Sequence, residues 1–289
     1  MDRRHAHQPF DRALISDFLR GRDILSVELL PAGKSNSNYK LILSDGEVCV
    51  LRLYNYGNAE RETYVLNLVR ELVPVPIEID RGATWSVFSF LEGELLEQVP
   101  EHSGAAAEAL AQIASVEFKS AGIINADGTI SPFSFGGSKG FIAEKLEDAE
   151  VRIWLGDELV DTLVAVFQRE AGRLDELDAQ SRLVHGDFNP TNILIHRGKV
   201  SGILDWEFCH AGTPYMDIGN LLRNTATDYH RAIKQGLEAG GMSFPNDWKA
   251  RAELVDVTSQ LEFLTSNRSE SFKRQCVARI KKFISKFKD

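Results

Sequence analysis

The sequence predicts an α+β fold in which a small antiparallel sheet at the N-terminus is followed by a larger, mainly helical part. Up to residue 92, short apolar strands alternate with turn residues around one long helix. From residue 93 onward the apolar spacing becomes helical, and one compact strand-rich interval at 183–205 interrupts it. We therefore expect two parts, residues 1–92 and 93–289. The helical patterns of the second part cover residues 103–120, 141–169 and 247–284.

The composition is that of an ordinary globular chain. The 289 residues include 33 Lys+Arg and 42 Asp+Glu, and the net charge of −9 argues against bulk binding of nucleic acid. The three cysteines, Cys49, Cys209 and Cys276, are too far apart for a zinc site or a disulfide framework. The sequence shows no secretory signal and no apolar run of the ~18 residues that a membrane span needs. We expect a cytoplasmic protein without a nucleic-acid or membrane partner, as a monomer or a homodimer.

Apolar spacing and turn residues define the elements of the N-terminal part. The segment FDRALISDFLR at 10–20 carries its apolar residues on one helical side. The turn SDGE at 44–47 joins two strands into a hairpin, and the prolines of VPVP at 73–76 end the long helix. The expected elements are a helix over 10–20, strands over 27–30, 39–43 and 48–53, a helix over 59–72 and a strand over 84–91.

The interval 183–205 reads LVHGDFNPTNILIHRGKVSGILD and contains the candidate catalytic and metal-binding residues. A short strand leads into the loop HGDFNPTN, and a hairpin follows that ends at Asp205. The arrangement brings Asp187, Asn192 and Asp205 together. In phosphoryl transfer a loop Asp accepts the proton of the attacking hydroxyl, and an Asn and a second Asp hold magnesium on the nucleotide phosphates. Hard oxygen ligands of this kind suit Mg²⁺, which also takes phosphate and water.

Three motifs resemble those of the aminoglycoside phosphotransferase family, which has the protein-kinase-like fold. They are HGDFNPTNIL at 185–194, ILDWEF at 203–208 and DIG at 217–219. Choline, homoserine and fructosamine kinases look similar, so the motifs define the reaction better than the acceptor. The resemblance implies a small N-lobe over residues 1–92 that binds the nucleotide and a helical C-lobe over 93–289 that carries catalysis. It also implies ATP, with GTP left open, and Mg²⁺ as cofactors.

The resemblance further implies two backbone segments that contact the nucleotide. The segment PAGKSNSNYK at 31–40 lies between the first two strands, where a phosphate-covering loop is expected, with Gly33 and Ser35 as its phosphate-binding residues. A hinge from Ser89 to Leu91 would bind adenine through its backbone groups. Backbone recognition leaves no side-chain signature in a sequence.

The strand VCVLRLY at 48–54 places Val50 and Arg52 on one face. By resemblance, Val50 lines the adenine pocket and Arg52 takes the place of the usual nucleotide lysine. Arginine keeps the charge and adds a planar fork for phosphate or carboxylate. Glu62 on the following helix would pair with it. Three alternatives remain open: Glu60 as the partner, a solvated charge on the helix, and an arginine that only reaches to solvent from the sheet edge.

Four more residues are expected near the reaction centre. His185 is interpreted as a structural hydrogen-bonding residue, because the loop aspartate already fills the role of base. Asp217 would anchor the backbone of the catalytic loop, or else act as a simple N-cap of its helix. Glu207 and His210 follow the magnesium aspartate closely enough to contact the acceptor.

The acceptor is expected to be a small molecule with a hydroxyl group. An acidic cleft would concentrate a cationic or amino-bearing compound such as an aminoglycoside, an amino sugar, choline or a homoserine-like alcohol. Solvated helix faces are the alternative interpretation of the acidic clusters. A nucleotide-binding pseudokinase without turnover and an enzyme that transfers a nucleotidyl group are the alternative functions. The acidic clusters are Glu92, Glu94 and Glu97; Glu144, Glu147, Asp148 and Glu150; and Asp157, Glu158 and Asp161.

Overall fold

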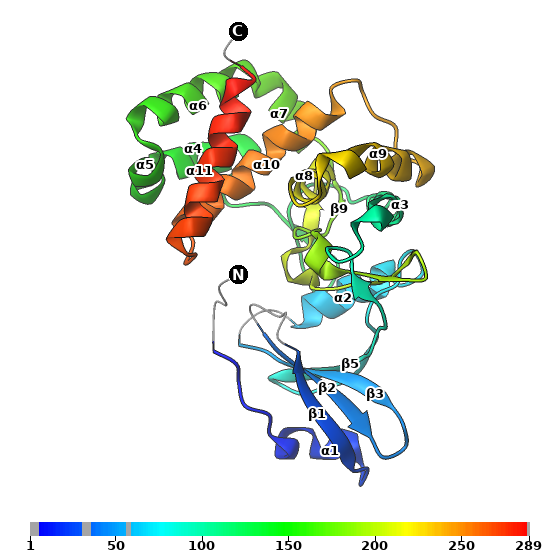
Figure 1. Ribbon diagram of the computed structural model, residues 1–289. Helices are drawn as coiled ribbons and strands as arrows, with labels where there is room; N and C mark the ends of the chain where they lie inside the picture. The colour runs from blue at the N-terminus through cyan, green and yellow to red at the C-terminus, as the bar shows by residue number, and fades with distance from the viewer. Residues whose placement is uncertain (1–5, 31–35, 56–58, 288–289) are drawn as a thin grey trace.

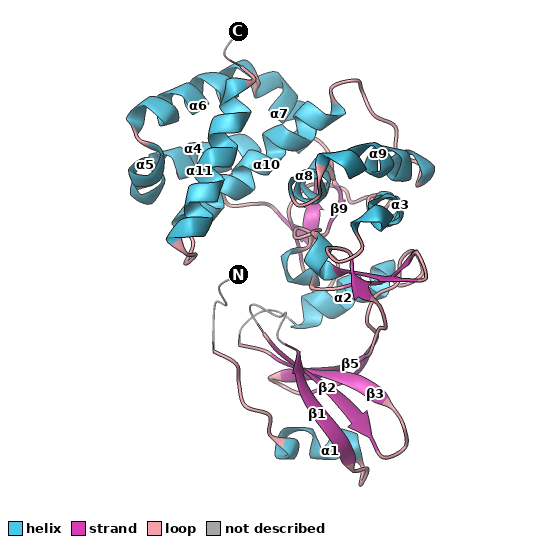
Figure 2. Cartoon of the chain, viewed as in Figure 1, coloured by secondary structure: helices cyan, strands magenta, loops and turns pink. Residues whose placement is uncertain are grey.

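The computed structural model describes residues 6–30, 36–55 and 59–287 (Figure 1). A five-stranded antiparallel sheet forms the N-terminal part, and helices dominate the rest of the chain, as Figure 2 shows. The α+β class and the antiparallel sheet are thus confirmed. The sheet order is β1-β2-β3-β5-β4. The strands are β1 Ile24–Leu30, β2 Ser37–Leu43, β3 Val48–Leu53, β4 Glu78–Arg81 and β5 Trp85–Ser89.

Two hydrophobic clusters cover the sheet. A short 3-10 helix, Arg12–Ile15, and α1, Ser16–Leu19, pack Ile15, Phe18 and Leu19 against strand residues such as Leu41 and Leu51. The expected helix over 10–20 is therefore wrong in length, because Asp11 caps its start and Arg20 at φ 47° ends it.

Helix α2, Ala59–Val69, belongs to the second cluster. It ends three residues before the expected position, ahead of the VPVP prolines. Its apolar residues Val65, Leu66 and Val69 join the large core of the helical part, and Phe88 of β5 joins them from the sheet. The helix therefore connects the sheet with the remainder of the molecule.

Short strands of the second part hold the functional loop. β10, Ile193–His196, pairs with β11, Lys199–Ile203, as expected, and also with β6, Glu94–Leu95. On the other side of the loop, β9, Arg182–Val184, pairs with β12, His210–Gly212. The sequence did not predict β4, β6, β12 or the small hairpin of β7, Ile123–Ile124, and β8, Ile130–Ser131, because two to four residues are too short for a hydrophobic period.

The long helical patterns are broken into shorter helices. The pattern over 141–169 is interrupted at Asp148 and again at Gly156, which has φ 76°. The pattern over 247–284 is interrupted at 266–269. No helix of the described ranges is both long and apolar enough to cross a membrane. The helices are α3 Ser103–Ile113, α4 Ser138–Glu147, α5 Ala149–Leu155, α6 Asp157–Arg169, α7 Ala171–Asp178, α8 Tyr215–Arg223, α9 His230–Ala239, α10 Trp248–Thr265 and α11 Glu270–Ser285.

Candidate active site

The loop after β9 is held rigidly by His185. Its Nε2 donates to the Leu204 carbonyl at 2.9 Å, and its Nδ1 accepts from the Asp187 N–H at 3.2 Å. Burial lowers the pKa of His185 to about 4, so the imidazole is neutral at neutral pH. Gly186 follows at φ 84°, and a Cβ there would lie 2.4 Å from the Phe208 carbonyl. Both ring nitrogens of His185 are therefore engaged in shaping the loop.

Asp217, in the first turn of α8, holds the same loop through hydrogen bonds to the backbone of the loop. Its Oδ2 accepts from the His185 N–H at 2.6 Å and its Oδ1 from the Gly186 N–H at 2.9 Å. The side chain is fully buried. Burial raises the pKa of Asp217 to about 7, and the two backbone donors oppose that rise. This geometry is that of a loop anchor and not of a simple helix cap.

We expect Asp217→Asn to destabilise the protein. One acceptor oxygen becomes an NH₂ group that faces a backbone N–H, so a buried donor loses its partner at a cost of about 1–3 kcal/mol. Urea unfolding followed by circular dichroism measures the change. Asp228→Asn is the matched control, because Asp228 is exposed. An equal midpoint for wild type and Asp217→Asn would contradict the anchoring role.

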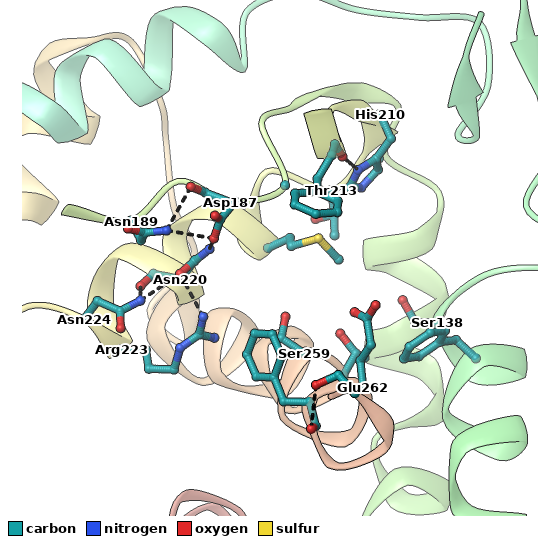
Figure 3. Close-up of a pocket in the computed structure, with 18 of the residues that line it drawn as sticks. Ser138, Asp187, Asn189, His210, Thr213, Asn220, Arg223, Asn224, Ser259 and Glu262 are labelled. Carbon is teal, nitrogen blue, oxygen red and sulfur yellow. Dashed lines mark hydrogen bonds between the residues drawn. The ribbon is translucent and has the colours of Figure 1, made fainter. Parts of the chain in front are cut away.

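Three asparagine amides donate to the carboxylate of Asp187. Asn189 Nδ2 lies 2.7 Å and Asn220 Nδ2 3.4 Å from Oδ1, as Figure 3 shows. Asn192 Nδ2 lies 3.0 Å from Oδ2. Asn189 also caps the short 3-10 helix Pro190–Asn192. The carboxylate is only half-buried, so it is both oriented and accessible.

Asn189 and Asn220 were not among the expected site residues. A weak signal for each exists in the sequence. Asn189 precedes a proline, as an N-cap residue often does. Asn220 lies three residues after Asp217 on one helix, so both face the same way. Neither pattern indicates contact with a carboxylate without the tertiary structure.

Asp205 follows β11 with φ 66°, a left-handed backbone conformation. Within the part of the chain that the structure describes, its carboxylate has no hydrogen bond and no ion pair. Burial raises the pKa of Asp205 to about 7; Arg52 opposes this rise and Glu207 adds to it. By solvent exposure Asp205 is half-buried, and a carboxylate partly removed from water without a partner is costly, so the site favours a bound cation.

The donor set fits a magnesium ion. Asn192 is nine-tenths buried and its Nδ2 is directed to Asp187, which leaves Oδ1 without a donor among the described residues. The Leu204 N–H donates to the Asn192 carbonyl at 2.8 Å and so ties the two ligand segments together. The described residues contain no group of three His, Cys, Asp or Glu side chains that could hold a metal. Two hard oxygen ligands therefore require phosphate and water to complete the shell.

Arg52 of β3 and Glu62 of α2 form a buried ion pair of 2.5 Å. Arg52 Nε also donates to Asn38 Oδ1 at 3.1 Å, and the guanidinium lies 5.4 Å from the ring of Phe88. Burial alone lowers the pKa of Arg52, but attraction to Glu62 and Asp205 outweighs it and raises that pKa. The partner is thus Glu62, whereas Glu60 is exposed.

The other expected nucleotide residues lie on or just after β3 and β5, toward the end of this strand pair away from Arg52, or lie outside the described ranges. Val50 is half-buried opposite Phe88. Ser89 donates its N–H to the Ile77 carbonyl at 2.8 Å, so this N–H is not available to a ligand. Leu91 is half-buried. Gly33 and Ser35 lie outside the described residues.

A cavity of about 840 Å³ opens beside Asp187. Asp205, Glu207 and His210 line it as well, whereas Arg52 and the expected adenine-side residues do not. The cavity therefore lies on the Asp187 side of the site, apart from Arg52. α8, α10, α11 and the segment before α4 supply the remaining walls (Figure 3).

One wall of the cavity is aromatic. Phe133 and Phe135 stack with their ring centroids 5.1 Å apart, and Phe141 meets Phe135 edge-on at 5.1 Å. His210 lies edge-on to Phe133 at 5.6 Å. Burial lowers the pKa of His210, and its Nδ1 is 3.0 Å from the Phe208 carbonyl. The wall is thus apolar and uncharged at neutral pH.

The carboxylates of the cavity differ from the expected acidic clusters. Of those clusters only Glu97 lines the cavity. Glu207 and Glu262 line it too, and Glu262 was not expected. Asp178 uses its carboxylate to hold the N–H and hydroxyl of Ser138. The other residues of the expected acidic clusters therefore do not line this cavity.

The fold, the loop carboxylates and the sheet–helix ion pair together define a phosphotransferase of the kinase type. The chain belongs to the phosphotransferase enzyme family (APH), whose model matches residues 26–254. The family membership expected from the motifs is thus confirmed. No curated protein sequence matches the chain.

Solved structures similar to this chain include macrolide and aminoglycoside phosphotransferases. The macrolide 2'-phosphotransferase MphH from Brachybacterium faecium matches with a TM-score of 0.69 and 16% identity, over 94% of this chain and 98% of that one. Aminoglycoside phosphotransferase APH(4)-Ia, in a complex with ADP and hygromycin B, matches with 0.67 and 17%, over 96% and 98%. APH(2")-IIa, in a complex with gentamicin, matches with 0.66 and 15%, over 94% and 96%. At these identities the likeness shows the fold.

Proposed function

We propose that this protein transfers the γ-phosphate of ATP, with Mg²⁺, to a hydroxyl group of a small molecule. The observation that supports this most directly is the position of Asp187. Its carboxylate is oriented by three amides and borders the cavity. Asp205 lines the same cavity and has no hydrogen bond or ion pair to any residue that the structure describes. We assign residues 1–92 to a nucleotide-binding lobe and 93–289 to a catalytic lobe.

The residues divide the reaction between them. Asp187 accepts the proton of the acceptor hydroxyl. The hydroxyl oxygen bonds to the terminal phosphorus of ATP, and the bond between that phosphorus and the ADP oxygen breaks. Arg52, held by Glu62, neutralises the other phosphates. Asn192 and Asp205 would hold Mg²⁺, which when bound neutralises charge on the phosphate oxygens. Catalysis then depends on orientation and charge neutralisation more than on covalent chemistry.

The cavity favours a multi-ring acceptor over a small alcohol. Its volume of about 840 Å³ lies in the range of sites for drug-sized ligands, far above what choline or homoserine would fill. Phe133, Phe135 and Phe141 provide an apolar wall, and Glu97 and Glu262 provide negative charge at other points of the rim. We infer an acceptor with an apolar face and one or more amino groups. Aminoglycosides, amino sugars with large substituents and macrolides have this character.

We expect Phe135→Ala to weaken acceptor binding without slowing the chemical step. Truncation removes the ring that contacts both Phe133 and Phe141, and aromatic burial of this kind contributes about 1–2 kcal/mol to binding. The KM for the acceptor should rise about tenfold with kcat within about twofold, in steady-state assays. Phe118→Ala is the matched control, because Phe118 packs on the core outside the cavity. A normal KM in Phe135→Ala would exclude the aromatic wall from acceptor binding.

The proposed function is tested by ADP release from Mg·ATP against a panel of acceptors. The panel contains aminoglycosides, macrolides, amino sugars, choline, homoserine and fructosyl-amines, with wild type and Asp187→Asn side by side. Release with one acceptor class in wild type only supports the proposal and names the class. Nucleotide binding with no release for any acceptor would instead favour a nucleotide sensor.

A further inference from the structure

Asn220 of α8 has a fixed amide orientation. Its Oδ1 accepts from Arg223 Nη2 and from Asn224 Nδ2, each at 2.8 Å. Its Nδ2 must then face the other way, toward Asp187 Oδ1 at 3.4 Å (Figure 3). The side chain is buried, with 5% of its surface exposed. Two donors on one oxygen exclude the flipped amide, because a flip would place NH₂ against two donors.

Arg223 is itself fixed from a different helix. Its Nη1 forms an ion pair with Asp256 of α10, and the side chains are only 9% and 15% exposed. Its guanidinium also lies 5.7 Å from the ring of Phe263. Arginine can hold both partners at once because its nitrogens form a planar fork.

The two helices approach closely at Gly219. A Cβ at this position would lie 2.6 Å from the Ala252 carbonyl and 2.9 Å from Cβ of Asp256. The glycine of the DIG motif therefore allows Asp256 to reach Arg223. Hydrogen bonds and an ion pair then run in sequence from α10 through Arg223 and Asn220 to the candidate base.

We propose that Asn220 is a positioning residue for Asp187 and that Arg223, held by Asp256, sets the orientation of Asn220. This inference rests on the proposed phosphotransferase function. Asn189 and Asn192 come from the same loop as Asp187, so they move with it. Asn220 is the amide that fixes the position of the Asp187 carboxylate relative to a separate helix, α8. Its loss should leave the loop folded and the carboxylate less well aimed at the acceptor hydroxyl.

The test compares four variants in steady-state kinetics with the acceptor found in the panel. Asn220→Leu should lower kcat by about 10–100-fold, with the KM for ATP within about twofold, because misalignment of a base affects the chemical step. Arg223→Met should lower kcat about tenfold. The double variant should be no slower than Asn220→Leu alone, because Arg223 acts through Asn220. Arg251→Met, which breaks ion pairs of α10 away from the cavity, is the matched control and should have the wild-type rate.

Arg223→Lys separates positioning from folding. Lysine can keep the charge pair with Asp256 but cannot also hold Asn220 in a fork. We expect wild-type thermal stability and the low kcat of Arg223→Met. A wild-type kcat in Asn220→Leu, full additivity in the double variant or full rescue by Arg223→Lys would each overturn the proposal.

A crystal structure of Arg223→Lys gives a readout that does not need turnover. The proposal predicts that the Asn220 amide or the Asp187 carboxylate has rotated, and unchanged side chains would overturn it. If wild type shows no turnover at all, the proposed function fails, while this structural result still decides the positioning role.

Discussion

Asp187→Asn should lower turnover by about 10²–10⁴-fold, the usual contribution of a general base. The nucleotide affinity should stay within about twofold of wild type, because Asp187 borders the cavity proposed for the acceptor and Arg52 lies elsewhere. The substitution keeps the shape of the side chain, and Asp217 and His185 hold the loop backbone independently of Asp187 Oδ1 and Oδ2, so the loop should stay folded. Acceptor-dependent ADP release and nucleotide titration measure the two effects.

Asp161→Asn on the exposed side of α6 is the matched control for this change. Its kcat and nucleotide affinity should equal those of wild type. A normal turnover in Asp187→Asn would require another base and would remove the central role given to this loop. Loss of nucleotide binding together with turnover would indicate unfolding, which circular dichroism detects.

Asp205→Asn should remove the magnesium dependence of nucleotide binding. The neutral amide is a much weaker ligand than a carboxylate, and bound metal contributes several kcal/mol to stabilising charge on the phosphate oxygens. We expect kcat to fall by about 10²–10³-fold, a loss of about 3–4 kcal/mol in transition-state stabilisation. Titration of ATP by calorimetry, with Mg²⁺ and with EDTA, measures the coupling.

In wild type the affinity for ATP should be higher with Mg²⁺ than with EDTA, and in Asp205→Asn the difference should largely disappear. Asp228→Asn should retain the wild-type difference. An equal effect of Mg²⁺ in wild type and Asp205→Asn would show that the ion is held elsewhere. Since this half-buried carboxylate has no hydrogen bond and no ion pair among the described residues, its neutral variant should also be at least as stable as wild type.

The sequence predicted the grouping of Asp187, Asn192 and Asp205 because short stretches of chain connect them. A loop of five residues and a tight hairpin leave little freedom in where the three side chains end. The pairing of Arg52 with Glu62 could also be predicted. The alternation of the strand gives the face of Arg52, the spacing of the helix gives the face of Glu62, and the family resemblance suggests that the two meet. The structure places this pair in direct contact.

Contacts between distant segments could not be predicted in the same way. Asp256 and Arg223 lie on separate helices, and neither belongs to a pattern that indicates the other. Helix lengths were wrong where one residue changes the backbone, as at Gly156, because the apolar spacing continues across the break. The acidic clusters were a poor guide to the cavity, because charge on a helix face does not show which way that face is turned.

The central claim is most directly tested by mass spectrometry of both products from one reaction. Mg·ATP and the acceptor identified in the panel are incubated with wild type and with Asp187→Asn. The account predicts equal amounts of ADP and of acceptor with one added phosphoryl group, formed by wild type only. AMP and pyrophosphate with a nucleotidylated acceptor, or an unmodified acceptor despite bound nucleotide, would contradict it.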